Sequence, residues 1–521
     1  MEPVVLVVLD GWVLSPLRQG NAIAMATTPF MQYAETHFPS FPLDAAGMSV
    51  GLLWGEKGNS EVGHMTVGAG RIVKQPFTRI TSALEDSTFF ANVPLRAACL
   101  HARQYSSRLH IVGLYSPGGV HGHMEHMHAL LRMAKAEGVS EIHLHLILDG
   151  RDVPPRESER SLATLEEVIK AQGVGCIATL MGRFYAMDRN HNWERTELSY
   201  KALREGTEIT YKSWRDALNN AYRQGVSDEF VVPVALSTPH GAITARISDN
   251  DAVIFTNFRA DRIVQLTESF VADPFTAFSR SRLNNCFVVS FTSYAKHLPV
   301  AGIAFPPQEL TVTLGSLVAA AGMHQIRIAE SEKEAHVTYF FNGEREEPYA
   351  HEDRVMVPSP TVEHFERTPE LSGARVTEEV LKALKSKQYQ FIVVNYANPD
   401  MLAHTGNIPA TIHAIEFVDR ELAKVWDAVK KKNGTLLITG DHGNAEEMVY
   451  PLHGEVNKDH SVNPVPFVVM HNALLTEKSH EAVTALQQRY DPVGILPDVS
   501  ATVLKFLNIA KPQGFVGQSL V

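Results

Sequence analysis

The sequence predicts an α/β protein with two α/β domains, one of them inserted into the other. Short apolar runs, such as residues 4–9 and 252–256, alternate with helix-type segments along the chain. The runs are apolar at nearly every position, which is typical of parallel strands buried on both faces. Carboxylates follow these runs in the outer parts of the chain, and arginines follow them in the middle part. Polar groups at strand ends favour parallel sheets with ligand sites at their carboxyl edges.

Composition and charge narrow the class of protein. The 521 residues, 45% of them hydrophobic, can bury a large core and suggest at least two domains. The net charge of −11 gives no general attraction to nucleic acid or acidic membranes, so neither is an expected partner. Only Cys99, Cys176 and Cys286 are present, without metal-ligand spacing, which indicates a reducing compartment. Because the sequence has no signal-peptide or membrane-span pattern, we expect a cytoplasmic protein.

Acidic residues follow three apolar runs in the outer parts of the chain. These are residues 4–9 with Asp10, residues 391–396 with Asp400, and residues 435–439 with Asp441. Pro399 suits the first turn of a helix, so Asp400 and His404 are expected on one face of its opening turn. Their spacing of four residues is a good metal-ligand spacing. The sequence therefore predicts metal ligands at the carboxyl edge of this sheet.

Ser60 lies in a glycine-rich stretch, residues 58–64, with the sequence GNSEVGH. We expect it on an exposed turn at the start of a helix, where free N–H groups and the helix dipole suit phosphate. Serine is a poor nucleophile until a base or a metal activates it. The outer parts of the chain supply an oxygen and imidazole set large enough for two divalent ions: Asp10, Ser60, Asp400, His404, Asp441, His442 and His460. Separate helix caps and surface histidines are the alternative, which the agreement of three strand ends disfavours.

The middle part of the chain has the same alternation but a different chemistry. Its predicted strands are residues 109–114, 142–148, 176–180 and 252–256. The residues that follow these strands include His121, Arg151, Asp152, Arg183, Arg189, Arg259 and Arg262. Guanidinium groups bind carboxylate and phosphate through two parallel hydrogen bonds, so converging arginines imply a small ligand with more than one anionic group. A single arginine is more often a solvated surface residue, but five at strand ends favour a binding site.

The domain boundaries follow from the prolines that flank the middle part. Gln75-Pro76 leaves the first outer piece, and the stretch 297–307, which has little regular periodicity, returns to the second. We predict one discontinuous domain, residues 1–75 and 309–521, which carries the metal candidates. The inserted domain, residues 76–308, carries the anion-binding candidates.

Several of these motifs resemble those of cofactor-independent phosphoglycerate mutases, in the same order and over nearly the whole chain. The matching segments are residues 9–12, 58–64, 68–71, 149–152, 182–189, 257–262, 398–406 and 441–444. The resemblance implies a phosphatase-like domain of the alkaline phosphatase superfamily, interrupted by an inserted transferase domain. It also implies two divalent metal ions, with Mn²⁺ expected and Mg²⁺, Co²⁺ or Zn²⁺ as alternatives.

The resemblance also implies a role for each matching residue. One metal would be held by Asp400, His404 and His460, and the other by Asp10, Ser60, Asp441 and His442. Substrate would be bound by His121, Arg151, Asp152, Arg183, Arg189, Arg259, Arg262 and Lys333. Ser60 would accept the phosphoryl group, Asp152 would exchange protons with the glycerate hydroxyls, and Lys333 would neutralise charge on the phosphoryl group. The chain departs from the family at residues 53–57, at Gly122, which is commonly serine, and in residues 357–368.

The implied reaction is the interconversion of 3-phosphoglycerate and 2-phosphoglycerate, without 2,3-bisphosphoglycerate, by a monomeric enzyme. A metal-dependent phosphatase or a mutase for another phosphosugar could use the same outer domain. A third alternative is a non-catalytic metal- or anion-binding protein, which the intact Ser60 and the full ligand set disfavour. A plain phosphatase does not need an arginine-rich insert to hold a released alcohol. The insert therefore favours the phosphoglycerate mutase.

Overall fold

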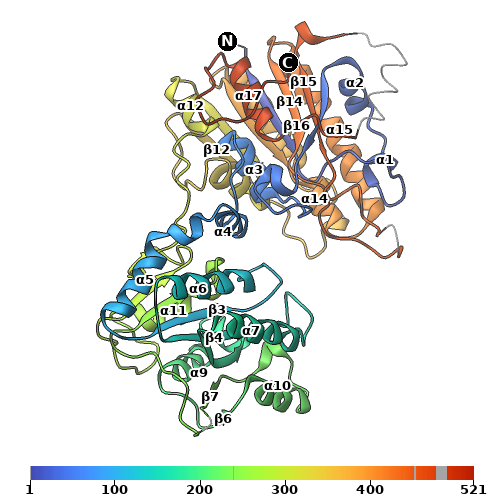
Figure 1. Cartoon of the computed structure of the whole chain (residues 1–521). Helices are drawn as coiled ribbons and strands as arrows, with labels where there is room; N and C mark the ends of the chain where they lie inside the picture. The colour runs from blue at the N-terminus through green and yellow to red at the C-terminus, as the bar shows by residue number, and fades with distance from the viewer. Residues whose placement is uncertain (1, 239, 451–452, 477–489) are drawn as a thin grey trace. The chain divides into compact units, whose positions relative to one another are not determined.

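The computed structural model describes residues 2–238, 240–450, 453–476 and 490–521. The chain divides into two compact units (Figure 1). Unit 1 consists of Met1–Gln75 and Glu309–Val521, and unit 2 of Pro76–Gln308. In the described part of the chain each unit contains an eight-stranded sheet with helices on both faces, which confirms the predicted α/β class. None of the described helices is both long enough and apolar enough to cross a membrane.

In the sheet of unit 1, the strands that the predicted site residues follow are parallel to one another. Its strands follow the order β12 (Glu352–Val357), β11 (Gln325–Glu330), β13 (Phe391–Tyr396), β1 (Val4–Leu9), β14 (Thr435–Gly440), β15 (Val465–Met470), β2 (Ser40–Asp44) and β16 (Gly494–Ile495). Neighbours from β12 to β14 are parallel, whereas β15 is antiparallel to both β14 and β2. The sheet is therefore mixed, and its parallel part extends from the edge strand β12 to β14.

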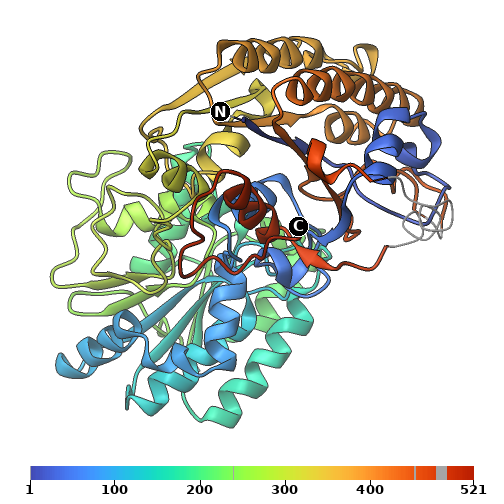
Figure 2. The same ribbon diagram turned by 90° about the horizontal axis from the view of Figure 1, so that it is seen from above.

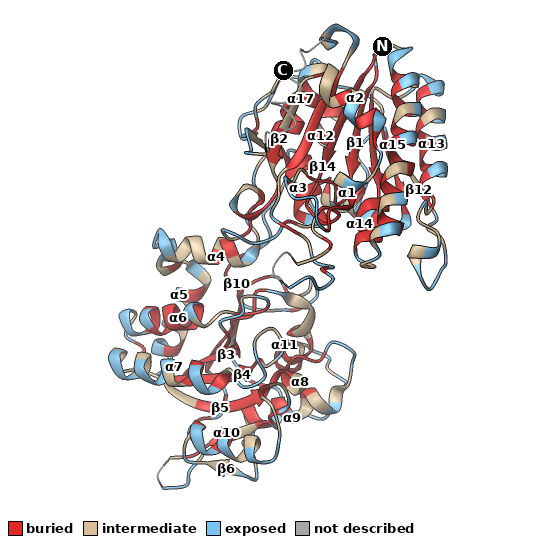
Figure 3. Ribbon diagram, turned by 90° about the vertical axis from the view of Figure 1, so that its right-hand side faces the viewer, coloured by how far each residue is buried: buried red, intermediate tan, exposed pale blue. Residues whose placement is uncertain are grey.

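The central strand β1 shows why the apolar runs are continuous. Val5, Val7 and Leu9 face one core, and Val4 and Leu6 face another. The helices on the first face are α2 (Pro29–His37), α13 (Gly373–Ser386) and α15 (Ile408–Lys430); those on the second are α3 (Ser60–Ala69), α12 (Leu314–Ala320) and α17 (Pro497–Phe506). Helices α13 and α15 run side by side on the outside of the sheet, and the strands between the two helical layers are buried (Figures 2 and 3).

Unit 2 repeats this layering around a second sheet. Its strands follow the order β10 (Gly302–Ile303), β9 (Phe287–Ser290), β8 (Ala252–Phe255), β3 (Leu109–Leu114), β4 (Ile142–Leu148), β5 (Cys176–Gly182), β7 (Val234–Leu236) and β6 (Thr210–Tyr211). One face is covered by α4 (Pro76–Glu85), α5 (Val93–Gln104), α6 (Met124–Ala136), α7 (Ser158–Gln172) and α10 (Trp214–Arg223). The other is covered by α8 (Arg183–Ala186), α9 (Trp193–Arg204) and α11 (Val264–Val271). The predicted strands 109–114 and 142–148 have the bounds that the sequence indicated.

Candidate functional site

The register of the central strands brings the acidic residues of unit 1 to one place. Leu9 at the end of β1 pairs with Tyr396 of β13 on one side and with Gly440 of β14 on the other. The three strands therefore end at the same level, so Asp10 and Asp441 leave adjacent strand ends. Asp400 lies in α14 (Asn398–Ala403), which begins two residues after β13.

His404 caps the C-terminal end of α14 instead of lying in an opening turn, because this helix contains only six residues. That part of the sequence prediction is wrong. The spacing of four residues still brings Asp400 and His404 together, since one helical turn separates them. His404 Nε2 lies 3.3 Å from Asp400 Oδ1.

Ser60 is the first residue of α3, whose N-terminus is capped by the Asn59 side chain accepting from the Val62 N–H. The expectation of an exposed turn is wrong, since Ser60 is only 6% exposed. Two glycines explain the burial. A Cβ on Gly63 would lie 2.5 Å from the carbonyl oxygen of Asp441, and one on Gly58 would lie 2.2 Å from that of Ala45. Glycine thus lets the first turn of α3 press against the loop that follows β14.

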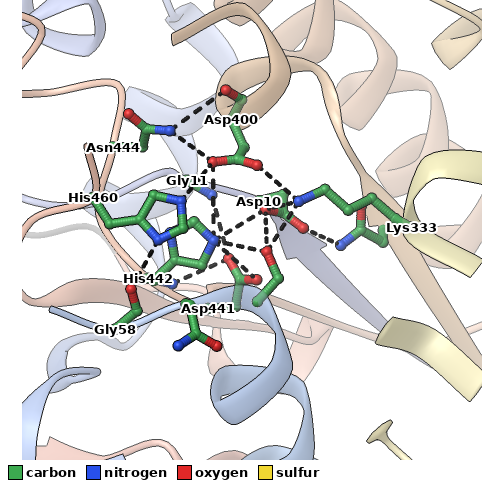
Figure 4. A network of polar contacts seen from close by, with 12 residues as sticks. Asp10, Gly11, Gly58, Lys333, Asp400, Asp441, His442, Asn444 and His460 are labelled. Atoms are coloured by element: carbon green, nitrogen blue, oxygen red, sulfur yellow. Dashed lines mark hydrogen bonds and ion pairs between the residues drawn. The ribbon is translucent and has the colours of Figure 1, made fainter. Parts of the chain in front are cut away.

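The Ser60 hydroxyl lies where three charged or titratable side chains converge. Its Oγ is 2.8 Å from His442 Nε2, 3.1 Å from Asp10 Oδ1 and 3.0 Å from Lys333 Nζ. Lys333 also donates to Asp10 Oδ1 and to Asp400 Oδ2, at 2.7 Å each. Figure 4 shows the side chains of Asp10, Lys333 and His442 pointing toward one another. Lys333 therefore joins the nucleophile candidate to two of the predicted metal ligands.

The charges in this cluster hold one another in their ionised forms. Burial acts to raise the pKa of Asp10 and of Asp400, but the Lys333 ammonium and the neighbouring histidines together outweigh it and hold both far below the usual range. Burial likewise acts to lower the pKa of Lys333, and these carboxylates raise it instead. For His442, the neighbouring carboxylates, Asp441 first, overcome burial and raise the pKa to about 9. The site is thus a buried set of mutually dependent charges.

Two histidines have tautomers that leave a ring nitrogen able to bind a cation. His404 Nδ1 donates to the carbonyl oxygen of Lys458 at 2.8 Å, and His460 Nδ1 donates to that of Gly58 at 2.9 Å. Each Nε2 is then left with a lone pair in the neutral ring, and the two Nε2 atoms lie 3.2 Å apart. Backbone carbonyls behind metal-binding imidazoles commonly fix this orientation.

An unsatisfied carboxylate oxygen fits a cation as well. Asp441 Oδ2 is buried and, within the described residues, has no hydrogen-bond partner. A buried carboxylate oxygen without a hydrogen bond is costly, and a divalent ion would satisfy this one. The residues present therefore fit divalent metal ions.

All seven predicted metal residues meet in this cluster, although the structure groups them less simply than the sequence did. Two sets have ligand atoms within 4.8 Å of one another: Asp400, His442 and His460, and Asp10, His64 and Asp441. His442 Nε2 lies 3.3 Å from Asp10 Oδ1 and 3.9 Å from Asp400 Oδ1, so it adjoins both sets.

His64 and Asn395 are site residues that sequence reasoning missed. His64 Nδ1 lies 2.9 Å from the carbonyl oxygen of Ser60 and 3.2 Å from Asp441 Oδ2. The Asn395 amide donates to Asp10 Oδ2 at 2.8 Å and to His64 Nε2 at 3.1 Å. The sequence does point to Asn395, because it is an amide inside the apolar run of β13. A buried amide requires a polar partner, which a site residue can supply.

Unit 2 gathers the other candidates at the carboxyl ends of its strands. Arg183 is buried, and its Nη1 donates to Asp149 Oδ1 at 2.6 Å and to Asp152 Oδ2 at 2.5 Å. Asp149 also accepts hydrogen bonds from the Ser116 hydroxyl and from the backbone N–H groups of Arg151 and Asp152. Asp149 thus fixes the loop that carries Asp152, a role that the sequence analysis did not assign.

Three of the five remaining candidates of unit 2 lie around Asp261. Its carboxylate lies 3.1 Å from Arg189, 3.3 Å from Arg259 and 3.6 Å from His121. Burial lowers the pKa of Arg262, and the nearby guanidiniums of Arg189, Arg183 and Arg151 lower it further. The seven candidates of the insert therefore form one cluster, whereas Lys333 belongs to unit 1.

Gly122, where serine is common in the resembled family, follows His121 in this cluster. A Cβ here would lie 2.6 Å from the carbonyl oxygen of Leu114. The backbone after His121 therefore passes too close to β3 for a side chain to be added without a shift.

Comparison with protein families assigns each unit. Residues 80–296, within unit 2, match the family model described as BPG-independent PGAM N-terminus. Residues 314–489, within unit 1, match that of type I phosphodiesterase / nucleotide pyrophosphatase. The predicted fold, an alkaline-phosphatase-like domain interrupted by a transferase domain, is confirmed by this pair of matches.

Relatives match the chain from end to end. A 2,3-bisphosphoglycerate-independent phosphoglycerate mutase of Chloroflexus aggregans is 45% identical over 541 aligned residues, which cover 100% of this chain and 98% of the relative. That of Moorella thermoacetica is 44% identical over 522 residues, with coverage of 100% and 98%. A crystal structure of Leishmania mexicana phosphoglycerate mutase at low cobalt concentration superposes with a TM-score of 0.65 at 30% identity, covering 99% and 97% of the two chains. The chain belongs to the family of 2,3-bisphosphoglycerate-independent phosphoglycerate mutases.

Proposed function

We propose that this protein interconverts 3-phosphoglycerate and 2-phosphoglycerate through a phosphoserine intermediate on Ser60, with two divalent metal ions and without 2,3-bisphosphoglycerate. The observation that carries the proposal is the position of the Ser60 hydroxyl, 2.8 to 3.1 Å from His442, Lys333 and Asp10. A serine in this setting can act as a nucleophile. The full-length relatives, which are named for the same mutase reaction, support the choice of substrate.

In this proposal, Asp400, His404 and His460 hold one metal ion, and Asp10, Ser60, Asp441 and His442 hold the other. Divalent ions would supply positive charge that lowers the pKa of the Ser60 hydroxyl and stabilises the phosphoryl group during transfer. Two backbone carbonyls keep the imidazoles of His404 and His460 in the required tautomer. His64 lies close enough to Asp441 to orient its carboxylate. We take Mn²⁺ as the metal, with Mg²⁺, Co²⁺ and Zn²⁺ as the alternatives to test.

The residues of unit 1 carry the phosphoryl transfer. Ser60 Oγ enters the step as the alkoxide and attacks phosphorus, the bond from phosphorus to the glycerate oxygen breaks, and an Oγ–P bond forms; the return transfer regenerates the alkoxide. Lys333, whose pKa is raised by its carboxylate partners, stays protonated and donates toward the phosphoryl oxygens. The N-terminus of α3, at which Ser60 lies, adds backbone N–H groups that favour the phosphate.

The residues of unit 2 bind glycerate and exchange its protons. Asp152 gives a proton to the departing glycerate oxygen, and then takes one from the neighbouring hydroxyl as that oxygen attacks phosphoserine. Arg183 hydrogen-bonds Asp152 and fixes its carboxylate. His121, Arg151, Arg189, Arg259 and Arg262, with Arg183, bind the carboxylate and phosphate of the substrate. All these groups come from one chain, which supports the expectation of a monomeric enzyme.

Metal removal tests this proposal. Chelation should abolish the conversion of 3-phosphoglycerate to 2-phosphoglycerate, and Mn²⁺, Mg²⁺, Co²⁺ and Zn²⁺, added back in turn, should identify the effective metal. Release of free phosphate is measured in the same assay. Undiminished mutase activity in protein shown to be free of metal would contradict metal dependence. Phosphate release as fast as isomerisation would indicate a phosphatase instead.

A further inference from the structure

A carboxylate lies in the middle of the anion-binding cluster of unit 2. Asp261 Oδ2 is 3.1 Å from Arg189 Nη1, and Oδ1 is 3.3 Å from Arg259 Nε and 3.6 Å from His121 Nδ1. Within the described residues, neither Asp261 Oδ1 nor His121 Nδ1 has a hydrogen-bond partner. One carboxylate therefore faces three of the seven groups that we assign to the substrate.

The charge of Asp261 works against anion binding. A negative group beside arginines repels the phosphate and carboxylate that they bind, and it cancels part of their positive field. A site optimised for charge alone would have a neutral residue here. Asp261 must therefore contribute something other than charge to the site.

The contacts of Asp261 indicate positional control. The side chains of Arg189 and Arg259 are 50% and 57% exposed, so few protein atoms restrict their rotamers. Immobilising an arginine side chain on binding costs conformational entropy, and prior ordering of the side chain reduces that cost. Asp261 holds Arg259 by Nε and Arg189 by a single Nη, which leaves terminal N–H groups of both free of this contact. It can therefore fix both side chains without using up the groups that bind phosphate or carboxylate.

The local backbone makes Asp261 a rigid anchor. It lies in the short 3-10 turn η4 (Ala260–Arg262), which is closed by the Ile263 N–H donating to the carbonyl oxygen of Ala260. Arg259 directly precedes this turn and Arg262 is its last residue, whereas Arg189 and His121 come from loops distant in sequence. The carboxylate thus connects the turn to two separate loops of the cluster.

We propose that Asp261 is a positioning residue that holds Arg189, Arg259 and His121 in the arrangement that binds the substrate anions. The proposal rests on the proposed function, because it takes these three groups as substrate ligands.

Binding without turnover tests the role directly. In Ser60→Ala protein, titration calorimetry measures the dissociation constant for 3-phosphoglycerate with and without Asp261→Asn. If Asp261 contributes only charge, removal of the carboxylate makes the cluster more positive and tightens binding. If it positions the arginines, affinity falls, by roughly tenfold for the two side chains that lose their order. Equal or tighter binding overturns the proposal.

Two further variants separate position from charge and from folding. Asp261→Glu keeps the charge but displaces it by one methylene, so its affinity should lie between those of the parent and Asp261→Asn. Glu166→Gln removes a carboxylate from an exposed pair with Arg215 elsewhere in unit 2, and should leave affinity unchanged. Weaker binding in Asp261→Asn that is accompanied by a lower thermal unfolding midpoint would assign the effect to folding and overturn the proposal.

Steady-state kinetics in the protein with Ser60 intact give an independent readout. Asp261→Asn should raise KM for 3-phosphoglycerate more than it lowers kcat, since the lost interaction binds ground state and transition state alike. A fall in kcat at unchanged KM would overturn the positioning role. The binding titration needs no phosphoserine chemistry, so it can fail or succeed independently of the proposed function.

Discussion

The two nitrogens of each candidate metal-binding imidazole have different tasks. In His404 and His460 the Nδ1 atom is fixed by a backbone carbonyl, and the Nε2 atom is presented to Asp400. This division lets the protein choose the tautomer before any ion arrives. The sequence shows only that an imidazole is present at each position. The carbonyl oxygens of Lys458 and Gly58 decide which ring nitrogen is available to bind a metal ion.

His460→Ala should weaken metal binding, because one ion loses a ligand whose geometry is already fixed. Equilibrium dialysis of the metal-stripped variant with Mn²⁺ should show an affinity lower by about tenfold or more. His453→Ala is the matched control, since His453 is exposed in the same loop region. Equal affinity in His460→Ala and His453→Ala would remove His460 from the ligand set.

Ser60→Ala should eliminate mutase turnover and phosphoserine formation while leaving the protein folded. The substitution removes one buried hydroxyl that makes hydrogen bonds with Asp10, His442 and Lys333 but does not alter the backbone of α3. Phosphoserine is detected by mass spectrometry after an acid quench. Ser49→Ala, which removes a hydroxyl hydrogen-bonded to Asp44, should retain activity. A near-normal rate in Ser60→Ala would mean that Ser60 does not carry the phosphoryl group.

At the scale of the element, α6 contains a histidine that the fold keeps neutral. His126 is fully buried among Phe77, Phe258 and Phe291, with its Nε2 3.3 Å from the Thr81 hydroxyl. Burial first, and then the neighbouring His123, lowers the pKa of His126 to about 3. This helix lies on the face of unit 2 that also contains α4, the first helix of the insert.

The lowered pKa predicts a loss of stability in acid. The unfolded chain binds a proton at His126 near pH 6.5, whereas the folded chain binds it only near pH 3, so the unfolded state holds more protons in between. The free energy of unfolding therefore falls as pH falls below 6.5. From pH 6.5 to pH 5 this single group should account for about 2 kcal/mol.

His126→Phe should make that fall smaller, because no proton can then be taken up at this position. Urea unfolding at pH 6.5 and pH 5 measures the difference. His413→Gln is the control, since His413 is half-exposed on α15. A decrease of the same size in His126→Phe and in the parent protein would show that His126 does not titrate as proposed.

At the scale of the whole molecule, each unit has its candidate groups at the carboxyl ends of its own parallel strands. Unit 1 places carboxylates, imidazoles and Ser60 there, and unit 2 places arginines and Asp152. Strand ends suit both sets because the chain leaves the sheet there with unpaired polar groups. The proposed reaction needs both chemistries, one to carry the phosphoryl group and the other to hold glycerate.

This division of tasks predicts that glycerate is retained between the two transfers. Turnover of unlabelled 3-phosphoglycerate in a large excess of isotopically labelled glycerate should leave the phosphoglycerate pool unlabelled, because the arginine cluster holds the alcohol while Ser60 holds the phosphoryl group. The reaction should also proceed without added 2,3-bisphosphoglycerate. Label that enters the pool as fast as isomerisation would contradict retention.

The sequence by itself determined the strands and the residue types at their ends. Continuous apolar runs such as 4–9 can be satisfied only by burial on both faces, and acidic or basic residues directly after them have to reach the sheet edge. These are local consequences of periodicity and chemistry. For that reason the seven metal candidates and the seven insert candidates could be named before their positions were known.

Tertiary structure decided how these residues meet. The common level at which β1, β13 and β14 end depends on the pairing of Val4 with Phe391 and with Thr435, segments that are far apart in the sequence. The burial of Ser60 depends on how closely Gly63 approaches the carbonyl of Asp441. The roles of His64, Asn395 and Asp261 depend on contacts that spacing does not encode. Local sequence sets which groups a strand end offers, but long-range packing sets the distances between them, and hydrogen bonding and charge stabilisation depend on those distances.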